Sequence, residues 1–336
     1  MRSPEPEGGH EATRVHQASL AGSAAVPCAA IAQPSPKVYR LGSLNPALPL
    51  AGAGPFGKIL IDALTQRGYA LGQNLTYDAR GSMGDNAKLP QLMEALKADP
   101  VDVVVGVGYP AAVLAKASKI PTVMAWGVGD PVATRLIDGL ARPGGNVTGI
   151  SDVATTLTTK RLELLKKVCP TLRRVAMLWN KDDLAMTLRY QASADVAKSI
   201  GVTVQPLGVR EPDDFDEAFA AMNTEPPDAI LMVADALTVL NRKRVFDFAV
   251  ERRLPAIYEY SFLVRDGGLM SYGPDLRECL ERAAAMVDLI FKGERPADLP
   301  FEEPTHYPFA INLKTVLAIG LTVPPTVLAL ADEVIQ

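Results

Sequence analysis

The sequence predicts an α/β protein made of two doubly wound lobes, each with a parallel sheet covered by helices. Short apolar segments alternate with amphipathic segments of helical period. This pattern stops in a stretch rich in Gly, Pro and Thr at residues 141–156 and then starts again. Strands that alternate with helices at this spacing are typical of parallel sheets with right-handed crossovers. The chain has 336 residues, which is enough for two cores.

Residues 1–36 are expected to be a signal-like or disordered segment outside both lobes. The segment begins polar and then becomes small and apolar. Ala30-Ile31-Ala32 has the A-x-A form of a secretory cleavage site. Pro27 interrupts the apolar region and acidic residues lie near the start, so the signal is atypical. A disordered tail is the alternative.

The first half of the chain is expected to hold four strands and three helices in alternation. Its strands are predicted at residues 37–44, 74–82, 101–108 and 120–128. Its helices are predicted at residues 55–69, 86–99 and 109–119.

The second half repeats this pattern. Its strands are predicted at residues 173–180, 202–209, 227–235 and 255–260, and its helices at residues 159–170, 184–201, 213–225 and 242–254. Residues 267–300 then predict a strand, a Gly-Pro-Asp turn and a long helix, and the end of the chain adds a strand and short helices. If these last elements cross back between the halves, the crossings form a hinge.

A glycine motif in the third predicted strand raises the question of a nucleotide cofactor. Gly106, Gly108 and Ala111 fit the G-x-G-x-x-A fingerprint of dinucleotide-binding folds. In dinucleotide-binding folds that fingerprint follows the first strand of the sheet, whereas this strand is the third in the chain. In addition, Pro110 removes one donor amide at the helix start. The next strand ends without the acidic residue that would bind a ribose. We therefore expect no cofactor.

Residues near the strand ends are the candidates for a ligand cleft, because open parallel sheets bind ligands outside the carboxyl ends of their strands. The candidates are Ser43, Tyr109, Trp126, Asn180, Asp235, Tyr258, Tyr260 and Tyr272. Several are aromatic in a chain with only 6% aromatic residues, which predicts a cleft that stacks a flat or apolar ligand. Asp235 and Asn180 would orient its polar end. Core packing of the aromatics and helix capping by the two polar residues are the alternatives.

Recognisable catalytic and metal sites are missing from the sequence. It contains no G-x-S-x-G elbow, H-E-x-x-H motif, Walker loop or C-x-x-C pair, and His306 is the only histidine after residue 36. We expect no catalytic residues and no metal. Cys169 and Cys279 are expected to be free thiols, with pairing in an oxidising compartment as the alternative. The sequence has no stripe of basic residues that would indicate nucleic acid binding. It also has no apolar run as long as the roughly 18–20 residues of a membrane-spanning helix.

Four separated blocks resemble one known family. Residues 129–152, 159–180, 254–276 and 297–335 are similar, in the same order, to the ABC-transporter substrate-binding proteins that include tryptophan and tyrosine binders. The resemblance extends from Lys37 to the end of the chain. It implies a type I periplasmic-binding fold with three segments crossing between the lobes.

The resemblance also implies a domain division and a function. Lobe 1 is expected at residues 37–151 plus 274–302, and lobe 2 at residues 152–273 plus 303–336. We place the crossings at residues 151–152, 273–275 and 302–305. The implied protein is an exported or periplasmic monomer that is not an enzyme. It binds a small molecule in the interlobe cleft and delivers it to an ABC permease.

Two residues depart from the family pattern and affect the expected ligand. Tyr109 stands where relatives often have a small or hydroxyl residue, and Trp126 lies near a position where they often have an apolar one. We therefore expect the ligand to be a small aromatic or apolar carboxylated molecule. Its identity does not have to be that of the ligands bound by the aromatic amino-acid binders. A ligand sensor that acts on a receptor or regulator is the alternative. An α/β enzyme that uses Asp235 and Glu259 is a third class.

Overall fold

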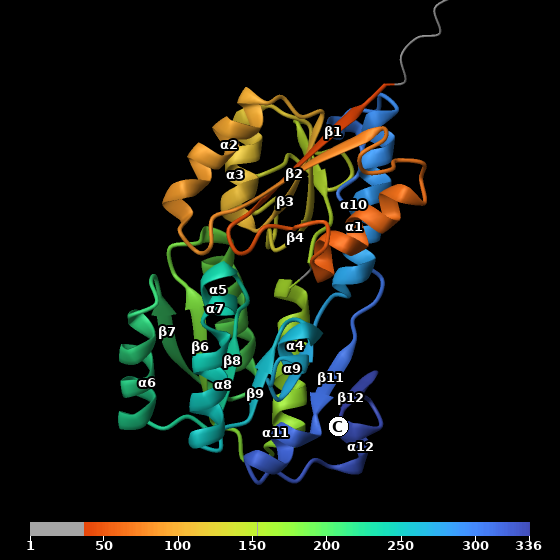
Figure 1. Ribbon diagram of the computed structural model, residues 1–336. Coiled ribbons are helices and arrows are strands. Elements are labelled where there is room, and N and C mark those ends of the chain that lie inside the picture. The colour runs from red at the N-terminus through yellow and green to blue at the C-terminus, as the bar shows by residue number, and fades with distance from the viewer. Residues whose placement is uncertain (1–36, 153) are drawn as a thin grey trace, which may run out of the picture. The chain divides into compact units, whose positions relative to one another are not determined.

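A computed structural model describes residues 37–152 and 154–336, which fold around two β-sheets (Figure 1). The first sheet has five strands in the order β2-β1-β3-β4-β5, and all its neighbouring pairs are parallel. Its strands are β1 (Tyr39–Asn45), β2 (Leu75–Gly81), β3 (Val103–Val107), β4 (Thr122–Trp126) and β5 (Val147–Gly149).

Helices cover both faces of the first sheet (Figure 1). The covering helices are α1 (Pro55–Thr65), α2 (Leu89–Ala98), α3 (Tyr109–Ser118) and α10 (Leu276–Phe291). The alternation of β3 explains the two faces, because Val104 packs with α2 and α3 whereas Val103 and Val105 pack on the side of α1 and α10. The long helix α10 thus returns from the far end of the sequence to the first sheet, where it contacts α1, β3 and β4.

The second sheet has seven strands in the order β12-β11-β10-β9-β8-β6-β7. They are β6 (Arg174–Asn180), β7 (Thr203–Val209), β8 (Ala229–Met232), β9 (Ala256–Tyr258), β10 (Met270–Tyr272), β11 (Phe309–Asn312) and β12 (Glu333–Ile335). The expectation of a wholly parallel sheet is wrong at one pair, because β10 and β11 are antiparallel. The chain leaves β10 toward α10 and comes back from that side, so β11 must run the opposite way.

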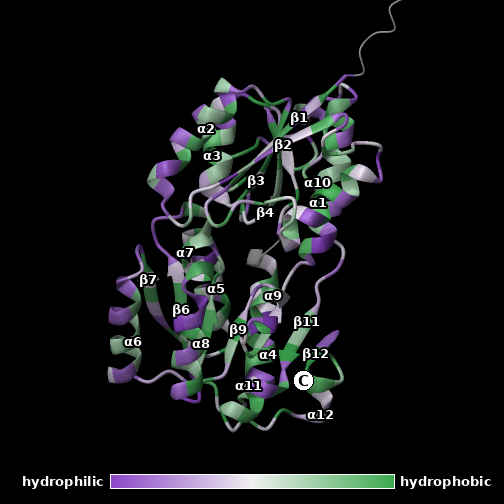
Figure 2. Cartoon of the chain, in the orientation of Figure 1, coloured by the Kyte–Doolittle hydropathy of each residue, from purple (hydrophilic) through white to green (hydrophobic). Residues whose placement is uncertain are grey.

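Successive side chains of β6 point to opposite faces of the second sheet and pack into two different cores. Val175 and Met177 pack toward α4 (Ala154–Val168) and α5 (Leu184–Ser199). Ala176 and Leu178 face the side of α6 (Asp214–Thr224) and α8 (Arg242–Glu251). Figure 2 shows hydrophilic residues on the outer side of α6 and hydrophobic residues along the strands. Short helices complete this half: α7 (Ala236–Leu240), α9 (Ser261–Arg265), α11 (Leu313–Ala318) and α12 (Pro325–Leu328).

The chain passes between the two sheets three times. It crosses between β5 and α4, between β10 and α10, and between the 3₁₀ turn η2 (Pro296–Asp298) and β11. The crossing segments are hydrogen-bonded to one another. The amide of Ser151 donates to the carbonyl of Glu302 at 2.7 Å, and the amide of Asp275 donates to the carbonyl of His306 at 3.0 Å.

Several short elements were not expected from the sequence, namely β5, α7, α9 and β12. Each is three to five residues long, too short for periodicity to show.

Cys169 is partly buried and Cys279 is buried, and both are free thiols. No helix among the described residues is long and apolar enough to cross a membrane. The signal-like or disordered segment at residues 1–36, including Cys28, lies outside the described residues.

The packing of α10 on the first sheet predicts the effect of two matched truncations. Leu280 is fully buried and Leu289, on the same helix, is 41% exposed. Leu280→Ala is expected to lower the free energy of unfolding by about 2–5 kcal/mol, because it leaves a cavity in the core. Leu289→Ala is expected to change it by about 0.5 kcal/mol or less. Urea unfolding measures both. Equal losses would mean that α10 does not pack as described.

Candidate functional site

A cavity of about 640 Å³ lies at the carboxyl ends of strands from both sheets. The first sheet contributes the last residues of three strands, Asn45, Val107 and Trp126. The second contributes Asp235 after β8 and Tyr260 after β9. This is the position at which open α/β sheets bind ligands, because helix starts and loop side chains converge there. Cavities of this size commonly hold small molecules.

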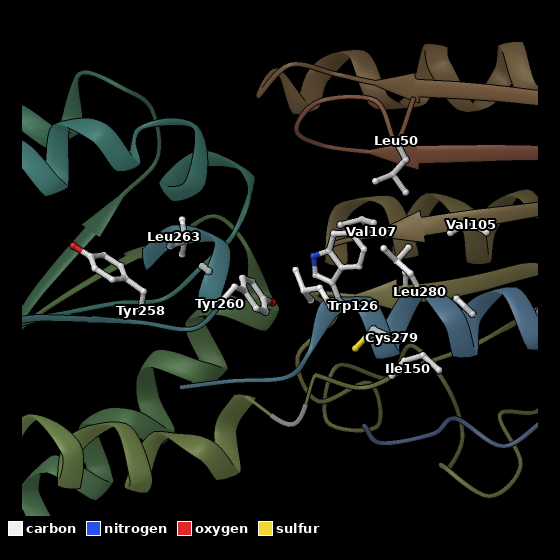
Figure 3. Close-up of a cluster of buried hydrophobic side chains, with 14 of the residues drawn as sticks. Leu50, Val105, Val107, Trp126, Ile150, Tyr258, Tyr260, Leu263, Cys279 and Leu280 are labelled. Carbon is white, nitrogen blue, oxygen red and sulfur yellow. The ribbon is translucent and has the colours of Figure 1, made fainter. Parts of the chain in front are cut away.

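Four aromatic rings, two from each half, line the cavity and contact one another. Phe56 in α1 packs against Trp126 with their ring centroids 5.6 Å apart. Phe56 also meets Phe262 of α9 edge to face, at 5.6 Å. Phe262 in turn stacks on Tyr260 at 5.9 Å. Figure 3 shows Trp126 and Tyr260 facing one another from the two halves. We call these four residues the aromatic cluster.

Glycines at the ends of β3 and β4 shape the wall that holds Trp126. Gly108 and Gly127 have positive φ angles of 78° and 80°. A Cβ atom on Gly127 would lie 3.2 Å from the Cα of Gly108, so the two turns approach each other closely. The glycine motif therefore serves a tight turn at the cavity edge, and its second glycine directly precedes α3.

The wall from the first half presents two helix starts without side-chain caps. Helix α1 follows Gly54 and helix α3 follows Gly108, and neither has an acidic residue in its first turn. Gly54, Phe56 and Gly108 all line the cavity. Pro55 in α1 and Pro110 in α3 each remove one amide donor, and the remaining first-turn amides together with the helix dipole give these helix starts a partial positive charge. This wall favours a negatively charged group.

The wall from the second half presents two carboxylates. Asp183 caps α5 by accepting bonds from the amides of Ala185 at 2.9 Å and Met186 at 3.2 Å. Asp235 caps α7 through Thr238, in a reciprocal capping box. Burial raises the pKa of Asp183 to about 7, and the charge of Asp235 adds to the effect. Burial also raises the pKa of Asp235. This wall favours a cation or a hydrogen-bond donor.

A buried ion network lies behind Tyr260. Arg189 is fully buried and binds Asp152 and Glu259, each at 2.7 Å. Arg161 binds the other oxygen of Glu259 at 3.1 Å. The hydroxyl of Tyr260 donates to Asp152 at 3.1 Å. Because Asp152 lies on the first crossing, the network joins this crossing to a residue that lines the cavity.

The structure brings together some of the residues predicted from the sequence. Trp126, Asp235 and Tyr260 line the cavity. Asn180 lies behind Asp235 and donates to its carboxylate at 2.7 Å. Tyr109 opens α3 and packs against the core of the second half, and its pKa is raised by burial and by the charge of Asp183.

Three more of the predicted residues are, like Asn180 and Tyr109, not among those that line the cavity. Ser43 is fully buried inside β1 and accepts a hydrogen bond from the Tyr77 hydroxyl at 2.9 Å. Tyr258 is buried within β9 and packs against Phe246, and Tyr272 packs in the core of the second half. All three lie within strands, so their side chains pack against helices that cover the sheets.

Sequence reasoning missed Phe56, Phe262 and Asp183. Phe262 follows Tyr260 by two residues in an aromatic run, which is a weak signal. Phe56 follows the Gly-Pro pair that opens α1, a pattern that predicts a helix start but not the ring's position. The sequence predicts Asp183 only as a residue that caps a helix, and gives no sign that it lines a cavity. Among the described residues, no group of acidic, His or Cys side chains is arranged to hold a metal ion.

Comparisons with known proteins agree with the resemblance seen in the sequence. A family model described as ABC transporter substrate binding protein matches residues 57–335. A tyrosine-binding protein of Clostridioides difficile is 26% identical over 266 residues, which cover 79% of this chain and 76% of that protein.

Two solved structures share the fold over 89% of this chain and all of theirs. The ABC domain from Streptococcus pneumonia in complex with L-Trp is 27% identical and superposes with a TM-score of 0.80. A conserved domain protein from Vibrio cholerae is 24% identical, with a TM-score of 0.82. The predicted α/β fold with its type I periplasmic-binding architecture is thereby confirmed.

The buried ion network predicts a large loss of stability when its central cation is removed. Arg189→Met removes the cation that the buried carboxylates Asp152 and Glu259 share, so the free energy of unfolding is expected to fall by about 3–5 kcal/mol. Lys198→Met, an exposed position on the same helix, is the control and is expected to change it by about 0.5 kcal/mol or less. Thermal and urea unfolding measure the difference. A variant of Arg189 as stable as the control would contradict the network.

Proposed function

Because the chain belongs to the family of ABC transporter substrate-binding proteins, we propose that it captures a small aromatic or apolar carboxylated molecule in the cavity between its sheets. The aromatic cluster is the observation that carries this proposal. Phe56 and Trp126 come from one half, and Tyr260 and Phe262 from the other, so an aromatic ligand among them contacts both. Aromatic pairs add about 0.5–1.5 kcal/mol each beyond the area they bury.

The carboxylate of the ligand is placed against the first half. The uncapped starts of α1 and α3 offer amide donors and a positive dipole end. Two of the three arginines that line the cavity, Arg242 and Arg265, are less suited to this role because carboxylates of the protein bind them. Arg242 pairs with Asp266 at 2.8 Å and Arg265 with Glu333 at 2.6 Å.

Ligand capture is coupled to a hinge in this proposal. We divide the chain into lobe 1 at residues 37–151 plus 274–302 and lobe 2 at residues 152–273 plus 303–336. The crossings near residues 151–152, 273–275 and 302–305 then absorb the rotation between the lobes. A ligand that contacts both lobes stabilises the closed form by its greater affinity for that form.

Delivery to a membrane permease completes the proposed role. The closed form is the species that the permease recognises, and the protein acts as an exported monomer without enzymatic activity. The family supports this assignment, since its members are the substrate-binding components of ABC transporters. A thermal-shift screen with aromatic acids, amino acids and dicarboxylates tests it. A melting temperature that none of them raises at millimolar concentration would argue against the proposed ligand class.

The two tryptophans of the chain allow a sharper test of the cavity. Trp126 lines it, whereas Trp179 stacks on Tyr190 at 3.7 Å, away from the cavity lining. With L-tyrosine as the probe, Trp126→Phe is expected to abolish the ligand-induced change in tryptophan emission and to weaken binding by about three- to tenfold. Trp179→Phe is expected to retain the emission change and the affinity. The reverse pattern would place the ligand elsewhere.

A further inference from the structure

Tyr109 occupies a different place from its two neighbours in the chain. Gly108 and Pro110 line the cavity, whereas Tyr109 is not among the lining residues. It packs instead against the core cluster of the second half, whose buried members all come from residues 162–270 and 309–327. Among the described residues, Tyr109 is the only one of the first half that belongs to this cluster. One aromatic side chain therefore crosses from the first half to the second outside the cavity.

A rigid turn sets the direction in which this side chain leaves the backbone. Tyr109 is the first residue of α3 and lies between Gly108, whose φ angle is 78°, and Pro110. Proline fixes its own φ, and Gly108 lies close against Gly127, so the turn has little freedom. A backbone held in this way loses little conformational entropy when its side chain docks on the other half.

The ring of Tyr109, rather than its hydroxyl group, makes the contact. The side chain is half-buried, and its hydroxyl forms no hydrogen bond with the residues that the structure describes. Burial is the main cause of the raised pKa of Tyr109, and the charge of Asp183 adds to it. The ring is thus partly removed from water close to the residue that caps α5.

Two close approaches of the backbone join the halves as well. A Cβ atom on Gly129, in the loop after β4, would lie 2.9 Å from the Cβ of Ala185 in the first turn of α5. A Cβ atom on Gly84, after β2, would lie 2.9 Å from the Cδ1 of Leu240 in α7. These contacts, like that of Tyr109, are between groups of the protein. Their strength therefore does not depend on which ligand is bound.

We propose that Tyr109 is a latch between the two halves. Its ring docks on the core of the second half and stabilises the closed arrangement without touching the ligand. The inference rests on the proposed function and adds to it a positioning residue, which acts through closure alone. When the halves separate, the ring leaves that core and its apolar surface returns to water.

The effect on binding follows from the population of the closed form. The apparent dissociation constant of a ligand that binds this form is the intrinsic constant divided by the closed fraction. The latch raises this fraction before any ligand binds. It therefore raises the affinity for every such ligand by one common factor, whereas a residue that contacts the ligand changes the affinities for different ligands unequally.

Calorimetric titration with chemically different probes tests the latch. The probes are L-tyrosine, L-tryptophan and indole-3-propionate. Tyr109→Ala is expected to weaken the binding of each by about tenfold, and by the same factor, because it removes an aromatic anchor between the halves. Tyr109→Phe keeps the ring and is expected to stay within about twofold of wild type. Val113→Ala, at an exposed position on the same helix, is a second control with the same expectation.

Three results of the titration would overturn the inference. One is an unchanged affinity in Tyr109→Ala. Another is a set of losses that differ by more than about threefold between probes, which would mean that Tyr109 contacts the ligand. The third is an equal loss in Tyr109→Phe, which would assign the effect to the hydroxyl group. If no probe binds the wild-type protein, the proposed ligand class fails, and a measurement without ligand decides on the latch.

The rate of disulfide formation between the halves measures closure without ligand. Gly129→Cys and Ala185→Cys are combined with Cys169→Ser, because Cys169 is only partly buried. The Cβ atoms of a disulfide are about 3.5–4.5 Å apart, so diamide links this pair only when the halves are close together.

This rate and the ligand affinity both scale with the closed fraction. Adding Tyr109→Ala to the cysteine pair is therefore expected to slow disulfide formation by about tenfold, the same factor as for the affinities, relative to adding Tyr109→Phe. Equal rates in the two variants would overturn the latch and leave the proposed function standing.

Discussion

Arg189 makes the interaction on which the arrangement around the cavity depends. Its guanidinium group binds Asp152 on the first crossing and Glu259 beside the cavity, with every partner fully buried. Glu259 also binds Arg161 of α4 and accepts from the amide of Ala234 at 3.1 Å. Burial of such charges is costly, and it is offset only when each group keeps good partners. The first crossing is therefore fixed to the second half.

The network connects this fixed point to the ligand site. Tyr260 belongs to the aromatic cluster and donates to Asp152, so the ring that meets the ligand is held by the residue that anchors the crossing. The aromatic contacts of Phe56 with Trp126 and Phe262 bring the first half against the second. In the proposed mechanism, a ligand adds its own contacts to these and favours the closed arrangement.

Most of the scaffold could be predicted because it depends on local periodicity. Short apolar runs mark β3 (Val103–Val107) and β6 (Arg174–Asn180) in the sequence, and both strands are buried on both faces of their sheets. The return of α10 to the first sheet was predicted only from the family resemblance, because no local pattern in the sequence indicates it. The short helix α7 was missed because capping by Asp235 fixes it, rather than an apolar stripe.

The site was harder to predict than the scaffold. Asp235 and Tyr260 follow strands and line the cavity, as expected from the rule that ligand cavities form at the carboxyl edge of a parallel sheet. Ser43 lies inside β1, because the strand continues to Asn45, which is the residue that lines the cavity. Phe56 became part of the site through contacts across the two halves, which no local pattern encodes. The raised pKa of Asp183 likewise depends on tertiary burial.

The central claim is that one ligand bridges two walls of opposite character. A crystal structure with the tightest-binding aromatic ligand tests it most directly. The predicted result is a ring among Phe56, Trp126, Tyr260 and Phe262, with the carboxylate within hydrogen-bond distance of the amides that open α1 or α3. A ligand bound outside this cavity, or one whose carboxylate faces Asp183 and Asp235, would contradict the account.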